Sequence, residues 1–152
     1  PENALWFVSN CHTVPWRFRV PSARFEYAHD LYSSGALNIS AYTKTDNCRK
    51  HSLLKQILRE KFDGLEPTMD QYTFYVSFEN SLCKDYITEK LWKILTSTDL
   101  IIPLGGLSME DYKNTVPPNS YIDVQNFTSP TKLAEHLKFV ATNSWAFNFY
   151  QQ

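Results

Sequence analysis

The stretch that decides the fold runs from Tyr72 to Ser97 and reads YTFYVSFENSLCKDYITEKLWKILTS. Its first part, from Tyr72 to Phe78, is aromatic and β-branched, which is typical of a strand. Its last part, from about Tyr86 to Ser97, carries apolar residues at helical spacing and predicts a helix. A strand followed closely by a helix is the repeating unit of a parallel sheet.

Further strands and helices alternate on both sides of this unit. Short apolar runs predict strands at 5–8, 37–42, 100–104 and 121–124. Helical patterns predict helices at 22–32, 52–61, 109–113, 131–142 and 144–152, the first of them with Ser22 as its N-cap. The alternation predicts an α/β fold: one Rossmann-like parallel sheet with helices on both faces, formed by residues 1–152 as a single domain. Pro103 lies inside one predicted strand, where it should cost a ladder hydrogen bond.

The composition excludes several classes of function. The 152 residues are 43% hydrophobic and 15% aromatic, as in an ordinary globular domain. The net charge of -1, with both signs interspersed, gives no electrostatic footprint for nucleic acid or an anionic membrane. The glycine-rich signatures of dinucleotide-binding and P-loop proteins are absent, and no Ser/His/Asp or Cys/His spacing supports a nucleophilic triad.

The junction between the strand at 72–78 and the following helix carries most of the polar chemistry. Ligands bind beyond the carboxyl ends of parallel strands, and Tyr86, Glu89 and Lys90 share one face of the predicted helix there. An aromatic ring, a carboxylate and an ammonium could hold a base or sugar, a ribose diol and a diphosphate. The same spacing also fits a solvated face with a Glu89–Lys93 ion pair worth about 0.3 kcal/mol, and spacing alone favours this simpler interpretation.

Basic residues also flank the first predicted strand-to-helix turn. Arg17, Arg19 and Arg24 lie there, and any of them could reach a phosphate at the edge of the sheet. Nothing in the spacing distinguishes among the three.

The cysteines and two glycosylation sequons bear on the cellular compartment. Cys11, Cys48 and Cys83 lack the paired short spacings of a zinc site, so three buried thiols are the simplest interpretation. Asn38 and Asn126 each begin an N-x-S/T sequon, which points instead toward the secretory pathway.

The stretch 72–92 resembles the defining motif of the GDP-fucose-dependent α-1,3-fucosyltransferases. The matching residues are Tyr72-x-Phe74-Tyr75-x-x-Phe78-Glu79-Asn80-Ser81 and Asp85-Tyr86-Ile87-Thr88-Glu89-Lys90-Leu91-Trp92. Segments at 6–11, 22–27 and 104–127 are similar to the first strand, the first helix and the closing section of this domain in the family. The resemblance covers nearly the whole chain.

The resemblance implies a GT-B architecture in which residues 1–152 form the C-terminal, donor-binding domain. It places an N-terminal acceptor domain, a membrane anchor and the general base outside this chain. When the family's functional residues are carried over one by one, the resemblance implies that Arg24 and Lys90 would contact the diphosphate and stabilise the leaving group. Asn80, Tyr86 and Glu89 line the rest of the GDP-fucose site. The resemblance implies no cofactor and no obligatory metal.

The implied activity is transfer of fucose from GDP-fucose to GlcNAc of a glycan, in α-1,3 linkage and with inversion. The acceptor would be carried by a glycoprotein or glycolipid, and the enzyme would be a type II membrane protein of the Golgi lumen. That compartment permits disulfides, and Cys11 with Cys48 is the expected pair. The alternative is a non-catalytic nucleotide-sugar-binding or interaction module derived from such an enzyme.

Overall fold

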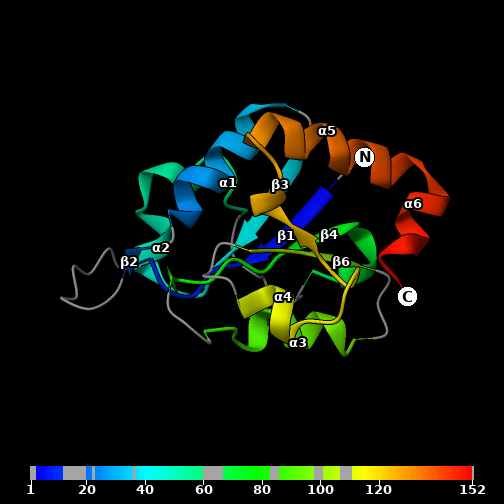
Figure 1. Cartoon of the computed structure of the whole chain (residues 1–152). Coiled ribbons are helices and arrows are strands. Elements are labelled where there is room, and N and C mark those ends of the chain that lie inside the picture. The colour runs from blue at the N-terminus through cyan, green and yellow to red at the C-terminus, as the bar shows by residue number, and fades with distance from the viewer. Residues whose placement is uncertain are drawn as a thin grey trace.

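Five parallel strands form the central sheet, in the order β3-β1-β4-β6-β7 (Figure 1). A computed structural model describes residues 3–11, 20–21, 23–35, 37–59, 67–82, 86–97, 101–106 and 111–151. The sheet consists of β1 Asn3–Phe7, β3 Asn38–Tyr42, β4 Phe74–Val76, β6 Ile102–Gly105 and β7 Ile122–Asp123. A separate antiparallel pair joins β2 Val20–Pro21 to β5 Ser81–Leu82. The α/β fold class predicted from the sequence is confirmed.

Helices cover both faces of the sheet (Figure 1). One face carries α1 Arg24–Ser33, α5 Pro130–Thr142 and α6 Ser144–Phe149, and the other carries α3 Glu89–Leu95 and α4 Asp111–Thr115. The short elements are α2 Asp46–Arg49, η1 Ser52–Leu54, η2 Met69–Gln71 and η3 Val124–Asn126. None of the helices in the described ranges is long and apolar enough to cross a bilayer.

The alternation of side chains along β1 divides the core between the two faces. Ala4 and Trp6 are buried in the cluster that includes residues of α1 and α5, whereas Leu5 packs with Tyr75 and Ile94 on the α3 face. Alternate residues of β1 therefore contribute to the cores on both faces of the sheet.

The order of the strands defines where a ligand can bind. The chain passes from β1 through α1 to β3 on one side, and β4 then pairs with β1 on the other side. In such doubly wound sheets the crevice lies at the carboxyl ends of the two strands where the winding reverses. Here those strands are β1 and β4.

The predicted helix at 52–61 is wrong. Among the described residues 52–59, only Ser52–Leu54 is helical, as a single 3-10 turn, and Leu58 then forms a parallel bridge with Ala41 of β3. The N–H group of Ala41 donates to the Ile57 carbonyl at 2.8 Å, and its carbonyl accepts from Arg59 N at 2.9 Å. This pairing satisfies backbone groups on the edge of β3 that would have no partner if residues 57–59 were helical.

Two predicted helix starts also need correction. The helix predicted from Tyr86 begins at Glu89, because Thr88 is the N-cap with extended backbone. The N-cap position of α1 is taken by Ala23, which has a left-handed φ of 50°, and the predicted N-cap Ser22 lies outside the described residues.

Pro103 does not break the sheet, contrary to the cost expected from the sequence. Toward β4, Ile102 N donates to Thr73 O and Leu104 O accepts from Ser77 N, both at 3.0 Å. The backbone N–H and C=O groups of successive residues in a strand point alternately to the two neighbouring strands, so the nitrogen of Pro103 points toward β7. Pairing with β7 begins only at Leu104–Ile122, so the missing N–H group has no ladder partner to lose.

Candidate functional site

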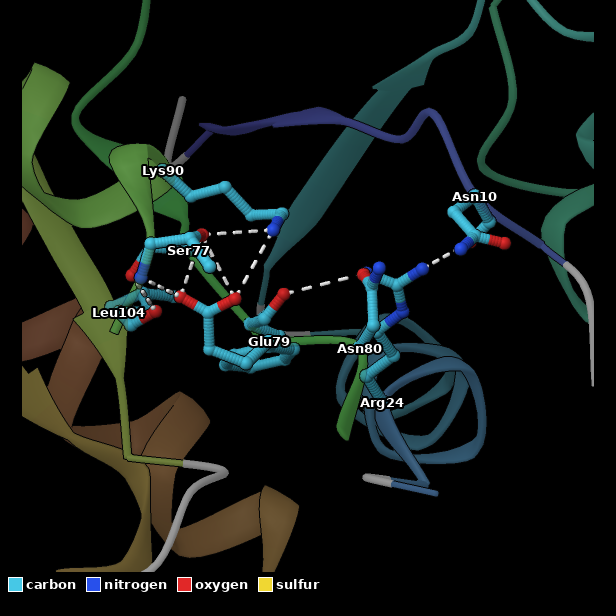
Figure 2. Close-up of polar contacts among 9 residues, drawn as sticks. Asn10, Arg24, Ser77, Glu79, Asn80, Lys90 and Leu104 are labelled. Carbon is cyan, nitrogen blue, oxygen red and sulfur yellow. Dashed lines mark hydrogen bonds and ion pairs between the residues drawn. The ribbon is translucent and has the colours of Figure 1, made fainter. Parts of the chain in front are cut away.

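Polar groups from four segments, one of them the backbone carbonyl of Asn10, lie at the carboxyl ends of β1 and β4. Asn10 follows β1, and Glu79 and Asn80 follow β4, while Arg24 and Lys90 stand in the first turns of α1 and α3. Figure 2 shows these side chains around the end of β4, with Arg24 and Lys90 on either side of the Glu79–Asn80 segment. The cluster therefore occupies the position that the sheet topology indicates for a ligand.

Arg24 is held by acceptors from both strands. Its guanidinium donates to the Asn10 carbonyl, to the Asn80 side-chain oxygen, and to the Phe78 carbonyl at 3.5 Å. The residue is only 4% exposed, and its guanidinium lies 4.7 Å from the centre of the Phe25 ring. Burial lowers the pKa of Arg24 to about 10, although the charges of Glu79 and then Tyr86 act in the opposite direction. Arg24 is therefore cationic at neutral pH.

Glu79 is the centre of the second half of the cluster. Its carboxylate is buried and accepts from Thr88 N at 2.7 Å, from the Thr88 hydroxyl at 2.9 Å, and from Lys90 Nζ at 3.1 Å. Lys90 Nζ also donates to the Thr88 hydroxyl at 3.0 Å, and the Lys90 side chain is 14% exposed. The first turn of α3 is thereby tied to the end of β4.

Contacts with β6 and Tyr112 further fix the region around the end of β4. The Ser77 hydroxyl donates to the Leu104 carbonyl at 2.8 Å (Figure 2). Tyr112 packs so closely against β6 that a Cβ on Gly105 would lie 2.6 Å from its ring. Burial, followed by the charge of Glu79, raises the pKa of Tyr112, so its hydroxyl stays protonated beside the carboxylate.

A pocket of about 270 Å³ adjoins the cluster on the α3 face of the sheet. Lys90 lines it and thus belongs to both the pocket and the cluster. The other lining residues come from the carboxyl ends of β1 and β3, from β4 and from α3: Phe7, Val8, Ser9, Tyr42, Thr43, Lys44, Tyr75, Glu89 and Lys93. Aromatic rings and lysines together suit a ligand that has a flat ring and negative charge.

The structure brings together some of the residues singled out from the sequence and separates others. Arg24, Asn80 and Lys90 belong to the cluster. Glu89 is exposed and faces the pocket instead, and Tyr86 is half-buried in the segment before α3. Lys90 is largely shielded and paired with Glu79, so the interpretation of this helix face as simply solvated is wrong for Lys90.

Glu79 is the site residue that sequence reasoning missed. It was part of the motif, but nothing marked it as different from any carboxylate after a strand. Its place immediately beyond β4, at the edge where ligands bind, is the signal that could have identified it. The predicted candidates Arg17 and Arg19, as well as Cys83, lie outside the described residues.

Cys11 and Cys48 form a disulfide, the pair named in the sequence analysis. Their Cα atoms are 4.9 Å apart, and the bridge ties the segment after β1, which includes Asn10, to α2. Both sequon asparagines are exposed, Asn38 at the start of β3 and Asn126 in η3. Within the described ranges, no group of three or more His, Cys, Asp or Glu residues is arranged to hold a metal ion.

Comparison with known proteins gives consistent results. The model of the family described as glycosyltransferase family 10 (fucosyltransferase), C-terminal part, matches residues 1–152. Glycoprotein 3-alpha-L-fucosyltransferase A of Drosophila melanogaster is 34% identical over 149 residues, which are 98% of this chain and 27% of that protein. The 4-galactosyl-N-acetylglucosaminide 3-alpha-L-fucosyltransferase 9 of Mus musculus is 44% identical over 139 residues, which are 91% of this chain and 33% of that protein.

A solved structure of an alpha1,3-fucosyltransferase with GDP has the same fold. Its TM-score is 0.61 at 21% identity, and the match covers 98% of this chain and 37% of that one. The chain thus spans a third or less of the length of the two relatives named above. The family model, which covers the whole chain, shows that the protein belongs to glycosyltransferase family 10, the fucosyltransferases, and corresponds to the C-terminal part of its members.

Proposed function

We propose that this chain supplies the GDP-fucose site of an α-1,3-fucosyltransferase that transfers fucose to GlcNAc with inversion. The observation that carries the proposal is that Arg24 and Lys90, from the first turns of α1 and α3, are both held at the end of β4, Arg24 by Asn80 and Lys90 by the buried Glu79. The relatives named above are α-1,3-fucosyltransferases, and one solved relative was determined with GDP. A pair of cations at the switch point of the sheet is what a diphosphate requires.

In the proposed reaction an acceptor hydroxyl attacks the anomeric carbon of fucose as the bond to GDP breaks. GDP leaves with additional negative charge, which Arg24 and Lys90 stabilise. The acceptor proton passes to a general base that we place outside this chain. Because both cations also bind the ground-state diphosphate, they affect donor affinity as well as turnover.

The rest of the donor is proposed to contact the neighbouring residues. Asn80 contacts Arg24, Glu89 lines the pocket beside Lys90, and Tyr86 precedes α3, and these positions support assigning the three residues to the donor. Glu89 is assigned to the ribose or the fucose. Because the two cations stabilise the charge of the leaving GDP, we propose that the reaction needs no metal ion. GDP affinity measured in EDTA should then equal the affinity measured in Mg²⁺.

Lys90→Met is expected to weaken GDP binding by about 10- to 100-fold, because a charge-assisted contact contributes about 1.5–3 kcal/mol. Methionine keeps the length and apolar stem of lysine but removes the ammonium group. Titration calorimetry with GDP, GDP-fucose and UDP-galactose measures the change and the preference for guanine.

The matched control is Lys138→Met, which removes an exposed lysine of α5 on the opposite face of the sheet. It should leave GDP affinity unchanged. A folded chain that binds GDP and UDP-galactose equally well, or that tolerates Lys90→Met, would contradict the proposed donor site.

We also propose that the full-length protein acts in the Golgi lumen as a type II membrane protein, on glycans of glycoproteins or glycolipids. The Cys11–Cys48 disulfide supports an oxidising compartment, and the two exposed sequons are compatible with it. The anchor and the acceptor domain are proposed to lie in sequence outside this chain.

If the compartment is assigned correctly, the chain secreted from eukaryotic cells should carry N-glycans. Asn126 stands in an exposed 3-10 turn and Asn38 at the exposed start of an edge strand. Digestion with peptide N-glycosidase should increase the electrophoretic mobility of the chain. Asn126→Gln and Asn38→Gln should each remove one glycan and so each increase the mobility of the undigested chain. A secreted, folded chain that has no glycan at either position would count against the assignment.

A further inference from the structure

The site contains a buried negative charge where the proposed ligand is itself an anion. Glu79 is 1% exposed, and a carboxylate in such a place is costly unless it is paired and hydrogen-bonded. Its charge also opposes the approach of a diphosphate. A group that carries both penalties needs a compensating role.

The contacts of Glu79 indicate that role. Its two oxygens accept from the backbone and hydroxyl of Thr88 and from the Lys90 ammonium, at 2.7–3.1 Å. The Thr88 hydroxyl also accepts from Lys90 Nζ, so the ammonium has two fixed partners, Glu79 and Thr88. A lysine side chain otherwise samples many rotamers, and this network removes that freedom before any ligand binds.

Glu79 also bears on Arg24, the other cation. Its charge partly offsets the effect of burial on the pKa of Arg24, and Asn80, the next residue, accepts from the Arg24 guanidinium. The end of β4 is therefore a common support for both cations.

We propose that Glu79 is a positioning residue for donor binding: it fixes the Lys90 ammonium and the first turn of α3, so that the diphosphate meets cations already in place. This inference rests on the proposed function of the site. Glu79 need not touch the donor, because its effect is exerted through Lys90.

The direction in which GDP affinity changes in Glu79→Gln separates this role from a purely electrostatic one. Glu79→Gln keeps the size and one acceptor oxygen for Thr88 but removes the charge that holds Lys90. If charge repulsion were the main effect, GDP would bind more tightly to the variant. If positioning is the main effect, we expect binding to weaken by about five- to tenfold, since preorganisation is lost.

A double-mutant cycle with Lys90→Met tests whether the effect passes through Lys90. In the Lys90→Met background, Glu79→Gln should change GDP affinity by less than about twofold, whereas a general loss of structure would weaken binding in both backgrounds alike. Tighter GDP binding by Glu79→Gln, or equal weakening in the two backgrounds, overturns the proposal.

A second measurement needs no ligand and therefore separates failure of this inference from failure of the donor site. In the unliganded chain, acetylation of Lys90 by an amine-reactive ester is followed by mass spectrometry, with exposed Lys93 of the same helix as internal reference. We expect Lys90 to react more slowly than Lys93, and Glu79→Gln to accelerate Lys90 several-fold while Lys93 is unchanged. An unchanged rate at Lys90 overturns the inference even if GDP binds.

A chain that does not bind GDP at all contradicts the proposed function, and the acetylation rates still decide the role of Glu79. Should Glu79→Gln fail to fold, Thr88→Val replaces it. This variant keeps the carboxylate and its charge but removes the hydroxyl that contacts both Glu79 and Lys90. It should raise the acetylation rate of Lys90, and it should weaken GDP binding by a smaller factor than the one expected for Glu79→Gln. The proposal is overturned if the acetylation rate or the GDP affinity stays unchanged.

Discussion

Arg24→Met is expected to weaken GDP binding by about 30- to 1,000-fold, the largest loss of affinity of any single substitution proposed for this protein. A guanidinium can bind a phosphate through two parallel hydrogen bonds, and such a pair is worth about 2–4 kcal/mol. Its position is fixed by the Asn10 and Phe78 carbonyls and the Asn80 side chain, so little ordering remains to be done on binding. Titration calorimetry against GDP measures the loss.

The same substitution should also destabilise the fold, because it leaves acceptors of both strands without their donor, at about 1–3 kcal/mol for a buried unpaired group. Affinity must therefore be measured on protein shown to be folded by circular dichroism. Arg49→Met is the matched control, since Arg49 pairs at 2.8 Å with an exposed aspartate of α2. Arg24→Lys should recover little binding because an ammonium cannot span the same acceptors. Full GDP affinity in folded Arg24→Met would contradict the proposed site.

The sequence was sufficient to predict the layers of this fold because buried parallel strands leave a strong local pattern. Runs such as that around Trp6 are apolar on both sides, and the helices between them repeat at helical spacing. The segment 52–61 shows where local pattern fails. Leu54 and Ile57 are buried as a helix would have buried them, but residues 57–59 pair with the edge of β3, which a local pattern does not reveal.

The candidate site was predictable in its cations but not in the network that holds them. The family motif identified Lys90, and the resemblance identified Arg24 among three arginines that local spacing could not distinguish. Glu79 follows β4 and Lys90 lies in α3, so no single helix or strand spans both residues, and their ion pair depends on how α3 packs against β4. Burial of a carboxylate is a property of the tertiary structure, and composition gives no signal of it.

Replacing both Cys11 and Cys48 by serine is expected to lower the free energy of unfolding by about 3–4 kcal/mol, the entropic effect of opening a loop of this length. The two cysteines are 37 residues apart in sequence, and the bridge ties the end of β1 to α2. Urea unfolding followed by circular dichroism should show a lower midpoint. Since Cys11 follows Asn10, whose carbonyl accepts from Arg24, GDP affinity should fall as well.

The control for this prediction is Cys83→Ser, which replaces a cysteine outside the bridge, and it should leave the Cys11–Cys48 contribution intact. Reduction of the unmodified chain with dithiothreitol should reproduce the loss of stability seen in the double variant, and should have no further effect on that variant. If the double variant unfolds at the same urea concentration as the unmodified chain, the bridge does not constrain the unfolded state. If stability falls but GDP affinity does not, the carbonyl of Asn10 stays in place without the bridge, and Arg24 is positioned by the end of β4 alone.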